Sequence, residues 1–239
     1  MECWYCNAPL IWQTDADLND VYENLEGIAT TLLCSECGAV WTGELIEEKT
    51  PLKLAVWGNM RSGKDTASDI LEETFKAAGL KVYRIAYADA ITEIIKNCFG
   101  DVLKVEQPKP REHYQLIGQT FRNLDPMVWI NLLNKKIQDE AWSYDVILIT
   151  DARQENEFQD LSKQGFKHIK INADEDVRIS RMKLKGEIID MQQLHHETEV
   201  FCKDLKADYL LNNNGNDLEI FKKDVQKLAS ELMEVAKGE

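Results

Sequence analysis

The sequence predicts an α/β domain, a parallel sheet with flanking helices, preceded by a small metal-binding module. Three features indicate this architecture. A glycine-containing loop at 58–64 stands between an apolar segment and a helical pattern. The segment 146–149 is continuously apolar, which is typical of a strand buried on both faces of a parallel sheet. Two Cys-x-x-Cys pairs, at 3–6 and 34–37, precede both.

Strands and helices alternate along the second part of the chain, as they do in parallel α/β folds. Short apolar runs predict strands, whereas apolar residues at helical spacing, such as Leu218, Phe221 and Val225, predict helices. Gly79 ends the first of these helices. The predicted strands lie at 52–57, 81–86, 146–150, 166–171 and 209–211, and the predicted helices at 67–78, 91–98, 113–118, 127–137, 153–164, 174–182, 191–205 and 218–235.

The chain divides into two predicted units. Residues 1–46 contain few apolar side chains and could not bury enough surface to fold alone, so we expect a bound metal to stabilise them. In this unit the sequence predicts short strands at 10–12 and 39–42, a solvated acidic loop at 15–20 and, after it, a linker at 44–51. Residues 52–239 form the α/β domain.

The composition is that of a soluble globular protein. Of its 239 residues, 44% are hydrophobic and 29% are charged. No apolar run is long enough to span a membrane and no signal peptide opens the chain, so we expect a cytoplasmic protein. The net charge of −14 argues against a broad nucleic-acid-binding surface, although a locally basic cleft can hold an anionic ligand.

The four paired cysteines, Cys3, Cys6, Cys34 and Cys37, predict a structural zinc site. Each pair presents two sulfurs from a tight turn, and two pairs complete a tetrahedron, which makes the first unit a zinc ribbon. A disulfide or a redox pair is the alternative, but a redox Cys-x-x-Cys normally lies in a βαβ pattern that this segment lacks. The two remaining cysteines are interpreted as small apolar residues.

The glycine-containing loop has the spacing of a phosphate-binding P-loop, G-x-x-x-x-G-K. Its glycines allow backbone N–H groups to surround an anion, and Lys64 can reach the β- and γ-phosphates of a nucleotide. Asp65 replaces the hydroxyl residue that usually contacts Mg²⁺, and it is a metal ligand, a favourable first-turn residue of the helix, or both. The predicted ATP-binding residues of the loop are Gly58, Asn59, Met60, Arg61, Ser62, Gly63, Lys64, Asp65 and Thr66.

Asp151 follows the continuously apolar strand, at the sheet edge where the P-loop is also expected. A carboxylate there can hold Mg²⁺ or a substrate; the alternative is that it caps the next helix. The guanidinium of Arg153, at the same edge, is suited to bidentate phosphate binding, and Glu157, four residues on, could pair with it.

Arg178 and Arg181 lie on one face of a predicted helix, and two lysines follow them. Arginines that close over a transferring phosphoryl group stabilise its charge, and a mobile lid that carries them excludes water. The alternative is a solvated basic helix that pairs with the acidic residues at 174–176.

The region between the second and third strands of the α/β domain is a candidate site for a phosphate acceptor. Asp89 follows the second strand at the same sheet edge. Arg111, Gln115 and Arg122 lie in the insertion that comes next. Taken singly, each of these residues is better explained as a surface charge than as a substrate contact.

Several segments, in the same order along the chain, resemble the deoxynucleoside monophosphate kinases of bacteriophages. These segments are GNMRSGKDT, AYADAI, YQLIGQTFRNLDPMVWI, ITDARQENEF and HHETE. The resemblance covers the chain from about residue 52 to its end. Members of that family are P-loop kinases with the signatures R-S-G-K-D-T and D-x-R-x-x-N-E, and they carry Asp after the P-loop lysine.

The resemblance implies ATP-dependent phosphorylation of a deoxynucleoside monophosphate, which supplies phage DNA precursors in the cytoplasm of a host bacterium. It implies Mg²⁺, bound with ATP near Asp65 and Asp151, and a donor adenine near Asn213 and Gly215. The catalytic residues that it implies are Lys64, Asp65, Arg153, Arg178 and Arg181. The acceptor-binding residues that it implies are Asp89, Arg111, Gln115, Arg122, Asp151 and Arg153.

The base preference of such an enzyme depends on the shape of its pocket. The candidates for lining that pocket are Trp129, Tyr87, Tyr114 and Phe121. The chain also departs from the family in two respects: HHETE replaces His-Pro-Ser-Glu, so His195 and His196 receive no role, and the ribbon lies outside the kinase core.

Two alternatives stay open. Dephospho-coenzyme A kinases and phosphomevalonate kinases share parts of the loop, so the acceptor could be another small molecule. In the second alternative, the P-loop domain senses a nucleotide without phosphoryl transfer, and the ribbon binds a partner. Because Lys49 is the first basic residue of the chain, the ribbon is a candidate contact for a protein partner or a second copy of the chain and not for nucleic acid.

Overall fold

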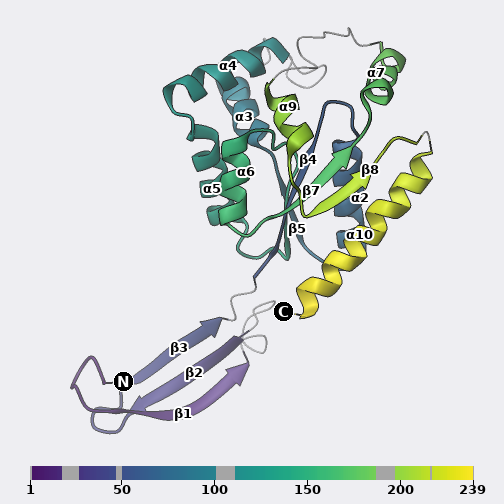
Figure 1. Ribbon diagram of the computed structural model, residues 1–239. Helices are drawn as coiled ribbons and strands as arrows, with labels where there is room; N and C mark the ends of the chain where they lie inside the picture. The colour runs from purple at the N-terminus through teal and green to yellow at the C-terminus, as the bar shows by residue number, and fades with distance from the viewer. Residues whose placement is uncertain are drawn as a thin grey trace. The chain divides into compact units, whose positions relative to one another are not determined.

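The computed structural model describes residues 2–17, 27–46, 50–100, 111–186, 197–215 and 217–238 (Figure 1). The chain forms two compact units, Met1–Thr50 and Pro51–Glu239. Within the described ranges, no helix is both long and apolar enough to cross a membrane.

The first unit contains a three-stranded antiparallel sheet in the order β1-β2-β3. Its strands are β1 (Leu10–Asp17), β2 (Gly27–Cys34) and β3 (Val40–Ile46). The sequence analysis missed β2, because its apolar and polar residues occur in pairs and do not alternate. Two further expectations were wrong: residues 15–17 extend β1 and do not form a loop, and residues 44–46 belong to β3 and not to a linker.

The second unit is built on a five-stranded sheet in the order β5-β6-β4-β7-β8, in which every neighbouring pair is parallel. The strands are β4 (Leu52–Gly58), β5 (Val82–Ile85), β6 (Val146–Ile149), β7 (Lys167–Asn172) and β8 (Tyr209–Asn212). All five correspond to predicted strands. The P-loop follows β4, the central strand, so structural elements on both sides of the sheet can reach it.

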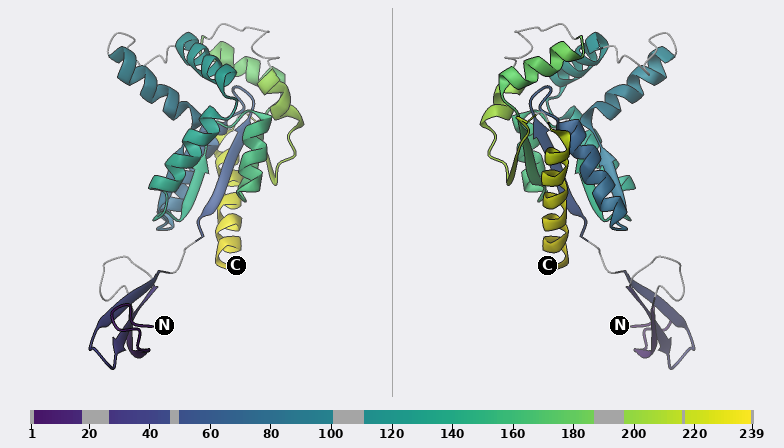
Figure 2. Two further views of the ribbon diagram at one scale, coloured as in Figure 1. Left: turned by 90° about the vertical axis from the view of Figure 1, so that its left-hand side faces the viewer. Right: turned by 90° about the vertical axis from the view of Figure 1, so that its right-hand side faces the viewer.

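Helices cover both faces of this sheet, as the two views of Figure 2 show. One face is packed against α2 (Lys64–Ala77) and α10 (Leu218–Gly238). The other is packed against α3 (Tyr87–Phe99), α5 (Val128–Glu140), α6 (Glu155–Lys163) and α9 (Glu197–Asp204). The remaining helices are α4 (Arg111–Leu124), beside α3 and α5, and α7 (Glu175–Leu184), after β7. The predicted fold class, a P-loop parallel sheet with flanking helices, is confirmed.

Burial on both faces explains the continuous apolar runs of the central strands. In β4, Leu54 and Val56 belong to the core cluster with α2 and α10, whereas Ala55 and Trp57 belong to the cluster on the opposite face. All four side chains are fully buried. The helix predicted at 191–205 is described from residue 197, and its earlier residues lie outside the described part of the chain.

A buried histidine joins β7 to β4. The indole N–H of Trp57 donates to Nδ1 of His168 at 2.9 Å, and Nε2 of His168 lies 2.9 Å from Oγ of Ser162. Because an indole can only donate, Nδ1 must be unprotonated, and the ring is neutral with its proton on Nε2. Burial lowers the pKa of His168.

This geometry predicts a pH dependence of stability that one substitution removes. An unfolded histidine has a pKa of about 6.5, so below that pH the unfolded chain binds more protons at this residue than the folded protein does. The contribution of His168 is complete above about pH 6.5 and is lost as the pH falls toward its lower folded-state pKa. We expect the free energy of unfolding, measured with urea, to fall more steeply between about pH 7 and 5 in the wild type than in His168→Gln. Equal pH slopes would contradict the assignment.

Candidate functional site

The P-loop turns from β4 into α2 between Gly58 and Lys64. A Cβ atom on Gly58 would collide with Oγ of Ser62 and would lie 2.9 Å from the carbonyl oxygen of Ile171. Gly63 has a φ of +101°, and a Cβ there would collide with the side-chain amide of Asn213. Both glycines of the motif are therefore required by the close packing of the loop against β7 and the segment after β8.

Lys64 is the buried cation of the loop. Its side chain is 9% exposed, and its Nζ lies 3.3 Å from Oδ1 of Asp65, whose side chain is 76% exposed. The open Asp65 carboxylate fits Mg²⁺, which keeps several water ligands and needs only one or two protein carboxylates. Ser62 Oγ is buried and has no hydrogen-bond partner among the described residues.

Two arginines of α7 hold the carbonyl groups of the loop. Nη1 of Arg178 donates to the carbonyl oxygen of Met60 at 3.3 Å. Nη1 of Arg181 donates to the carbonyl oxygens of Arg61 and Ser62 at 3.2 and 3.3 Å. Burial lowers the pKa of Arg181. The two predicted lid arginines thus contact the main chain of the P-loop directly.

The loop after β8 also contacts the P-loop. Asn213 donates its side-chain amide to the carbonyl oxygen of Ser62 at 2.8 Å, and Nη2 of Arg181 donates to the carbonyl oxygen of Asn213 at 2.8 Å. Gly215, the second residue predicted to lie near adenine, accepts from Arg181 at 3.4 Å. A pocket of about 330 Å³ opens beside these residues; its lining is Asn212, Asn213, Gly215, Asp217, Ile220, Phe221 and Asp224.

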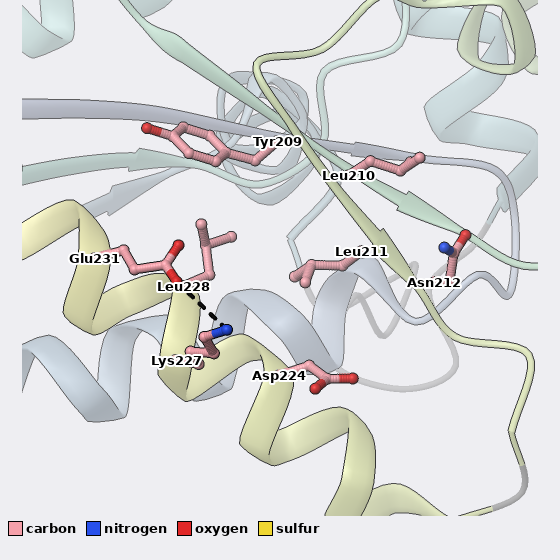
Figure 3. Close-up of a pocket in the computed structure, with 8 residues that line it drawn as sticks. All are labelled: Tyr209, Leu210, Leu211, Asn212, Asp224, Lys227, Leu228 and Glu231. Atoms are coloured by element: carbon pink, nitrogen blue, oxygen red, sulfur yellow. Dashed lines mark ion pairs between the residues drawn. The ribbon is translucent and has the colours of Figure 1, made fainter.

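A second pocket, of about 360 Å³, lies between β8 and α10 (Figure 3). Apolar side chains of both elements line it, including Leu211 of β8 and Leu228 of α10. On α10, Nζ of Lys227 lies 3.8 Å from Oε1 of Glu231. None of the predicted catalytic residues lines this pocket. The predicted phosphate-binding loop, 58–66, is therefore not part of this pocket.

The sequence analysis missed Glu199, a residue of α9 that contacts the P-loop. Its carboxylate accepts the backbone N–H of Met60, at 3.1 and 3.0 Å to the two oxygens, and the side-chain amide of Asn59 at 2.9 Å. It also lies 3.4 Å from Nη1 of Arg178. Glu199 is the last residue of the HHETE segment, and only the histidines of that segment were considered as candidates. His195 and His196 lie outside the described part of the chain.

Just after β6, Asp151 caps α3. Its two oxygens accept the backbone N–H groups of Tyr87 and Ala88 at 2.7 and 2.9 Å. Burial raises the pKa of Asp151, and the two backbone hydrogen bonds act in the opposite direction. Asp151 therefore caps a helix other than the one that follows it in sequence.

Glu157 caps α6 through the main chain of the preceding residues. One oxygen accepts the backbone N–H groups of Arg153 and Gln154 at 2.7 and 3.0 Å, and the other lies 3.8 Å from Nη2 of Arg122. Burial raises the pKa of Glu157 to about 7. The guanidinium of Arg153, which the sequence suggested as the partner of Glu157, forms no hydrogen bond or ion pair with any described residue.

The other predicted acceptor residues have different environments. Asp89 accepts the backbone N–H of Ala86 at 2.8 Å at the start of α3. Gln115 is exposed on α4. Trp129 is 2% exposed and donates its indole N–H to Gly118 at 3.1 Å, so it belongs to the core and joins α5 to α4. Arg111 begins α4, and its side chain lies outside the described part.

The four cysteines of the first unit form a compact sulfur cluster, in which all ligand atoms lie within 4.8 Å of one another. The Sγ atoms of Cys3 and Cys37 are 3.7 Å apart, and those of Cys6 and Cys34 are 3.4 Å apart. Tetrahedral zinc, with Zn–S bonds of about 2.3 Å, requires sulfurs about 3.8 Å apart, whereas a disulfide requires about 2.05 Å. The thiols are free, and the cluster is compatible with a zinc ribbon.

The two cysteine turns have matching backbone geometry. The N–H of Cys3 donates to Ala8 and that of Cys34 donates to Ala39, both at 2.8 Å. Asn7 and Gly38, each directly after the second cysteine of a pair, have positive φ angles of 58° and 70°. The backbone N–H of Cys37 lowers the pKa of Cys34 to about 7, whereas the adjoining thiol of Cys34 contributes to raising the pKa of Cys6 to about 12.

Comparisons with known proteins identify relatives of parts of this chain. No family model matches it. The chain is 32% identical over 132 residues to uncharacterized protein ORF77 of Ictalurid herpesvirus 1 (strain Auburn), and the match covers 55% of each protein. The chain thus spans about half the length of this curated relative.

Solved structures resemble the second unit at low sequence identity. A sugar kinase from Janibacter sp. HTCC2649 is 16% identical, with a TM-score of 0.47, and the match covers 78% of this chain and 96% of that one. Dephospho-CoA kinase from Campylobacter jejuni is 13% identical, with a TM-score of 0.46 and coverage of 76% and 97%. Shikimate kinase from Bacteroides thetaiotaomicron is 14% identical, with a TM-score of 0.46 and coverage of 77% and 98%. Similarity at this level identifies neither an activity nor a substrate.

The sulfur cluster predicts a bound metal. We expect about one zinc ion per chain in protein purified under reducing conditions without chelators, measured by plasma mass spectrometry. Cys34→Ser should lose the zinc, because it removes a buried ligand. Cys98→Ser, which changes an exposed thiol of α3, should retain it. Wild-type protein without metal would contradict the site.

Proposed function

We propose that the second unit is a kinase that transfers the γ-phosphoryl group of ATP to a deoxynucleoside monophosphate. The observation that carries this proposal is the presence of two cationic groups at one sheet edge. Lys64 follows β4, and Arg153, whose guanidinium has no partner among the described residues, follows β6, a hydrogen-bonded parallel neighbour of β4. The carboxyl ends of adjacent parallel strands are where α/β proteins bind their ligands.

The strand order supports separate donor and acceptor sides. β4, with the P-loop, lies in the middle of the sheet. On one side, β6 and β5 lead to Arg153, Asp151 and the start of α3. On the other, β7 and β8 lead to Arg181 and Asn213. An acceptor on the first side and a nucleoside on the second would both have a phosphate near the P-loop.

The proposed chemistry requires positioning and charge neutralisation, with no covalent intermediate. Lys64 and the loop N–H groups bind the donor phosphates, Arg153 orients the acceptor phosphate for in-line attack, and Arg178 and Arg181 add positive charge beside the loop. Mg²⁺, which P-loop kinases generally use with ATP, supplies further neutralisation of the phosphates when bound. Asp65 and Asp151 are the residues that would hold it.

The choice of a deoxynucleoside monophosphate as acceptor is supported by the resemblance of DARQENEF and the other segments to phage kinases. Another small-molecule acceptor and a nucleotide-sensing module are the competing functions. The proposed zinc ribbon, residues 1–46, takes no part in this chemistry. Its lack of basic residues favours a protein contact over a nucleic-acid contact.

The decisive assay is ADP release from Mg·ATP with each of the four deoxynucleoside monophosphates. We expect turnover with at least one of them, and loss of that turnover in Lys64→Ala, because the donor phosphates lose their buried cation. Lys76→Ala, which changes an exposed lysine at the end of the same helix, is the matched control and should retain activity.

The outcomes of this assay separate the candidate functions. Turnover that persists in Lys64→Ala would refute the role of the P-loop. ATP binding without turnover on any of the four acceptors would favour a different small-molecule acceptor or a nucleotide sensor.

Arg153 provides a second test, on the acceptor side. Arg153→Ala should lower kcat/KM for the acceptor about 10- to 100-fold, as expected for the loss of charge-assisted hydrogen bonds, and should leave ATP affinity nearly unchanged. Arg153→Lys keeps the charge without the bidentate geometry and should be intermediate. Arg84→Ala, which removes an arginine paired with Asp69 and Glu72, is the control. An unchanged acceptor KM and kcat in Arg153→Ala would refute the assignment.

A further inference from the structure

We propose that Glu199 is a positioning residue of the P-loop: together with Arg178 it fixes the main chain at Met60 in the conformation that receives a nucleotide. This inference rests on the proposed function of the loop as a nucleotide site. It also gives a role to the last residue of HHETE, a segment to which the proposed chemistry assigns no function.

Donors from two consecutive loop residues converge on Glu199. The backbone N–H of Met60 lies 3.1 and 3.0 Å from its two carboxylate oxygens. The side-chain amide of Asn59 donates to Oε2 at 2.9 Å and to the carbonyl oxygen of Glu199 at 2.8 Å. The segment that leaves β4 is therefore held to α9 through both main-chain and side-chain hydrogen bonds.

Arg178 closes the arrangement from the other side of Met60. The same Nη1 atom lies 3.3 Å from the carbonyl oxygen of Met60 and 3.4 Å from Oε2 of Glu199. The carboxylate of Glu199 thus accepts the N–H of Met60. The guanidinium of Arg178, which is paired with that carboxylate, donates to the C=O of Met60. Since Arg181 holds the next two carbonyl groups, the loop cannot rotate these peptide planes without breaking charge-assisted hydrogen bonds.

The burial of the pair makes its loss costly to the loop. Glu199 is 5% exposed and Arg178 is 6% exposed. Removing one member of a buried ion pair leaves the other without compensation, and Nε of Arg178 already has no hydrogen-bond partner among the described residues. Without Glu199, we expect Arg178 to move and the N–H of Met60 to lose its acceptor.

The rest of α9 is anchored to the strand that leads into the loop. Cys202 and Leu205, in and just after α9, are buried in the core cluster that contains Trp57. The ring of Phe201 contacts Trp57, with 6.1 Å between the ring centroids. Glu199 is thus held on the same framework as Gly58, which is the requirement for a residue that sets the conformation of the loop.

The test is the affinity of the full-length protein for Mg·ADP, measured by calorimetry well below the unfolding temperature. Glu199→Gln should weaken binding about tenfold or more, because a buried charge-assisted interaction is lost. Amide hydrogen exchange in the peptide that contains 58–64 should become faster. In turnover, the KM for ATP should rise more than the KM for the acceptor. Glu175→Gln removes a half-exposed carboxylate 3.8 Å from the same arginine and should change the affinity less than about twofold.

Each other outcome has a definite meaning. A lower melting temperature with unchanged ADP affinity and loop exchange would overturn the proposal, because Glu199 would then act on stability alone. Tighter ADP binding would also overturn it, because Glu199 would then compete with phosphate. If Glu199→Gln does not fold, Asn59→Ala, which removes one of the converging donors, decides by the same readouts. Wild-type protein that binds Mg·ADP but phosphorylates no deoxynucleoside monophosphate would refute the proposed kinase function, while the Glu199 test would stay valid. Wild-type protein that does not bind Mg·ADP would refute both the kinase function and the positioning role of Glu199.

Discussion

The second unit depends on how the polar main-chain groups of the P-loop are satisfied. Residues 59–62 lie between β4 and α2, outside the regular hydrogen bonding of the sheet and of the helix. Their carbonyl oxygens therefore need hydrogen-bond donors from other groups. Arg178, Arg181 and Asn213 donate to the carbonyls of Met60, Arg61 and Ser62. Cations on the carbonyl side leave the opposite side of the loop, with Lys64, for an anion. A chain with a net charge of −14 thus carries the cationic side chains of Lys64, Arg178 and Arg181 at this loop, and the first two are paired with carboxylates.

The acidic residues at this sheet edge have a complementary role. Asp151, Asp89 and Glu157 all accept backbone N–H groups at the starts of α3 and α6. Carboxylates are favourable at helix N-termini because they satisfy donors that have no partner within the helix. With these carboxylates hydrogen-bonded to the main chain, the guanidinium of Arg153 has no hydrogen-bond or ion-pair partner among the residues that the structure describes.

The first unit follows a different principle of stabilisation. Among its described residues, 2–17 and 27–46, no helix covers the sheet, and large apolar side chains such as Trp4, Trp12 and Val40 are 60 to 80% exposed. Cys3 and Cys34 are among its few fully buried residues, and they lie at the sulfur cluster. A unit with so little buried apolar surface needs a further source of stability, and a four-thiolate metal site would supply it.

Local sequence patterns were sufficient to predict the strands of the α/β unit, the position of the P-loop and the cysteine cluster. These depend on local patterns: continuous apolar runs, fixed glycine spacing and paired cysteines. The hydrogen-bond partners of the polar side chains follow from the tertiary structure and not from local sequence. Asp151 caps the start of α3 at Tyr87, which lies 64 positions earlier in the chain. Glu199 reaches Met60 across 139 positions. Such contacts depend on the strand order and on helix packing, and no local pattern in the sequence encodes them.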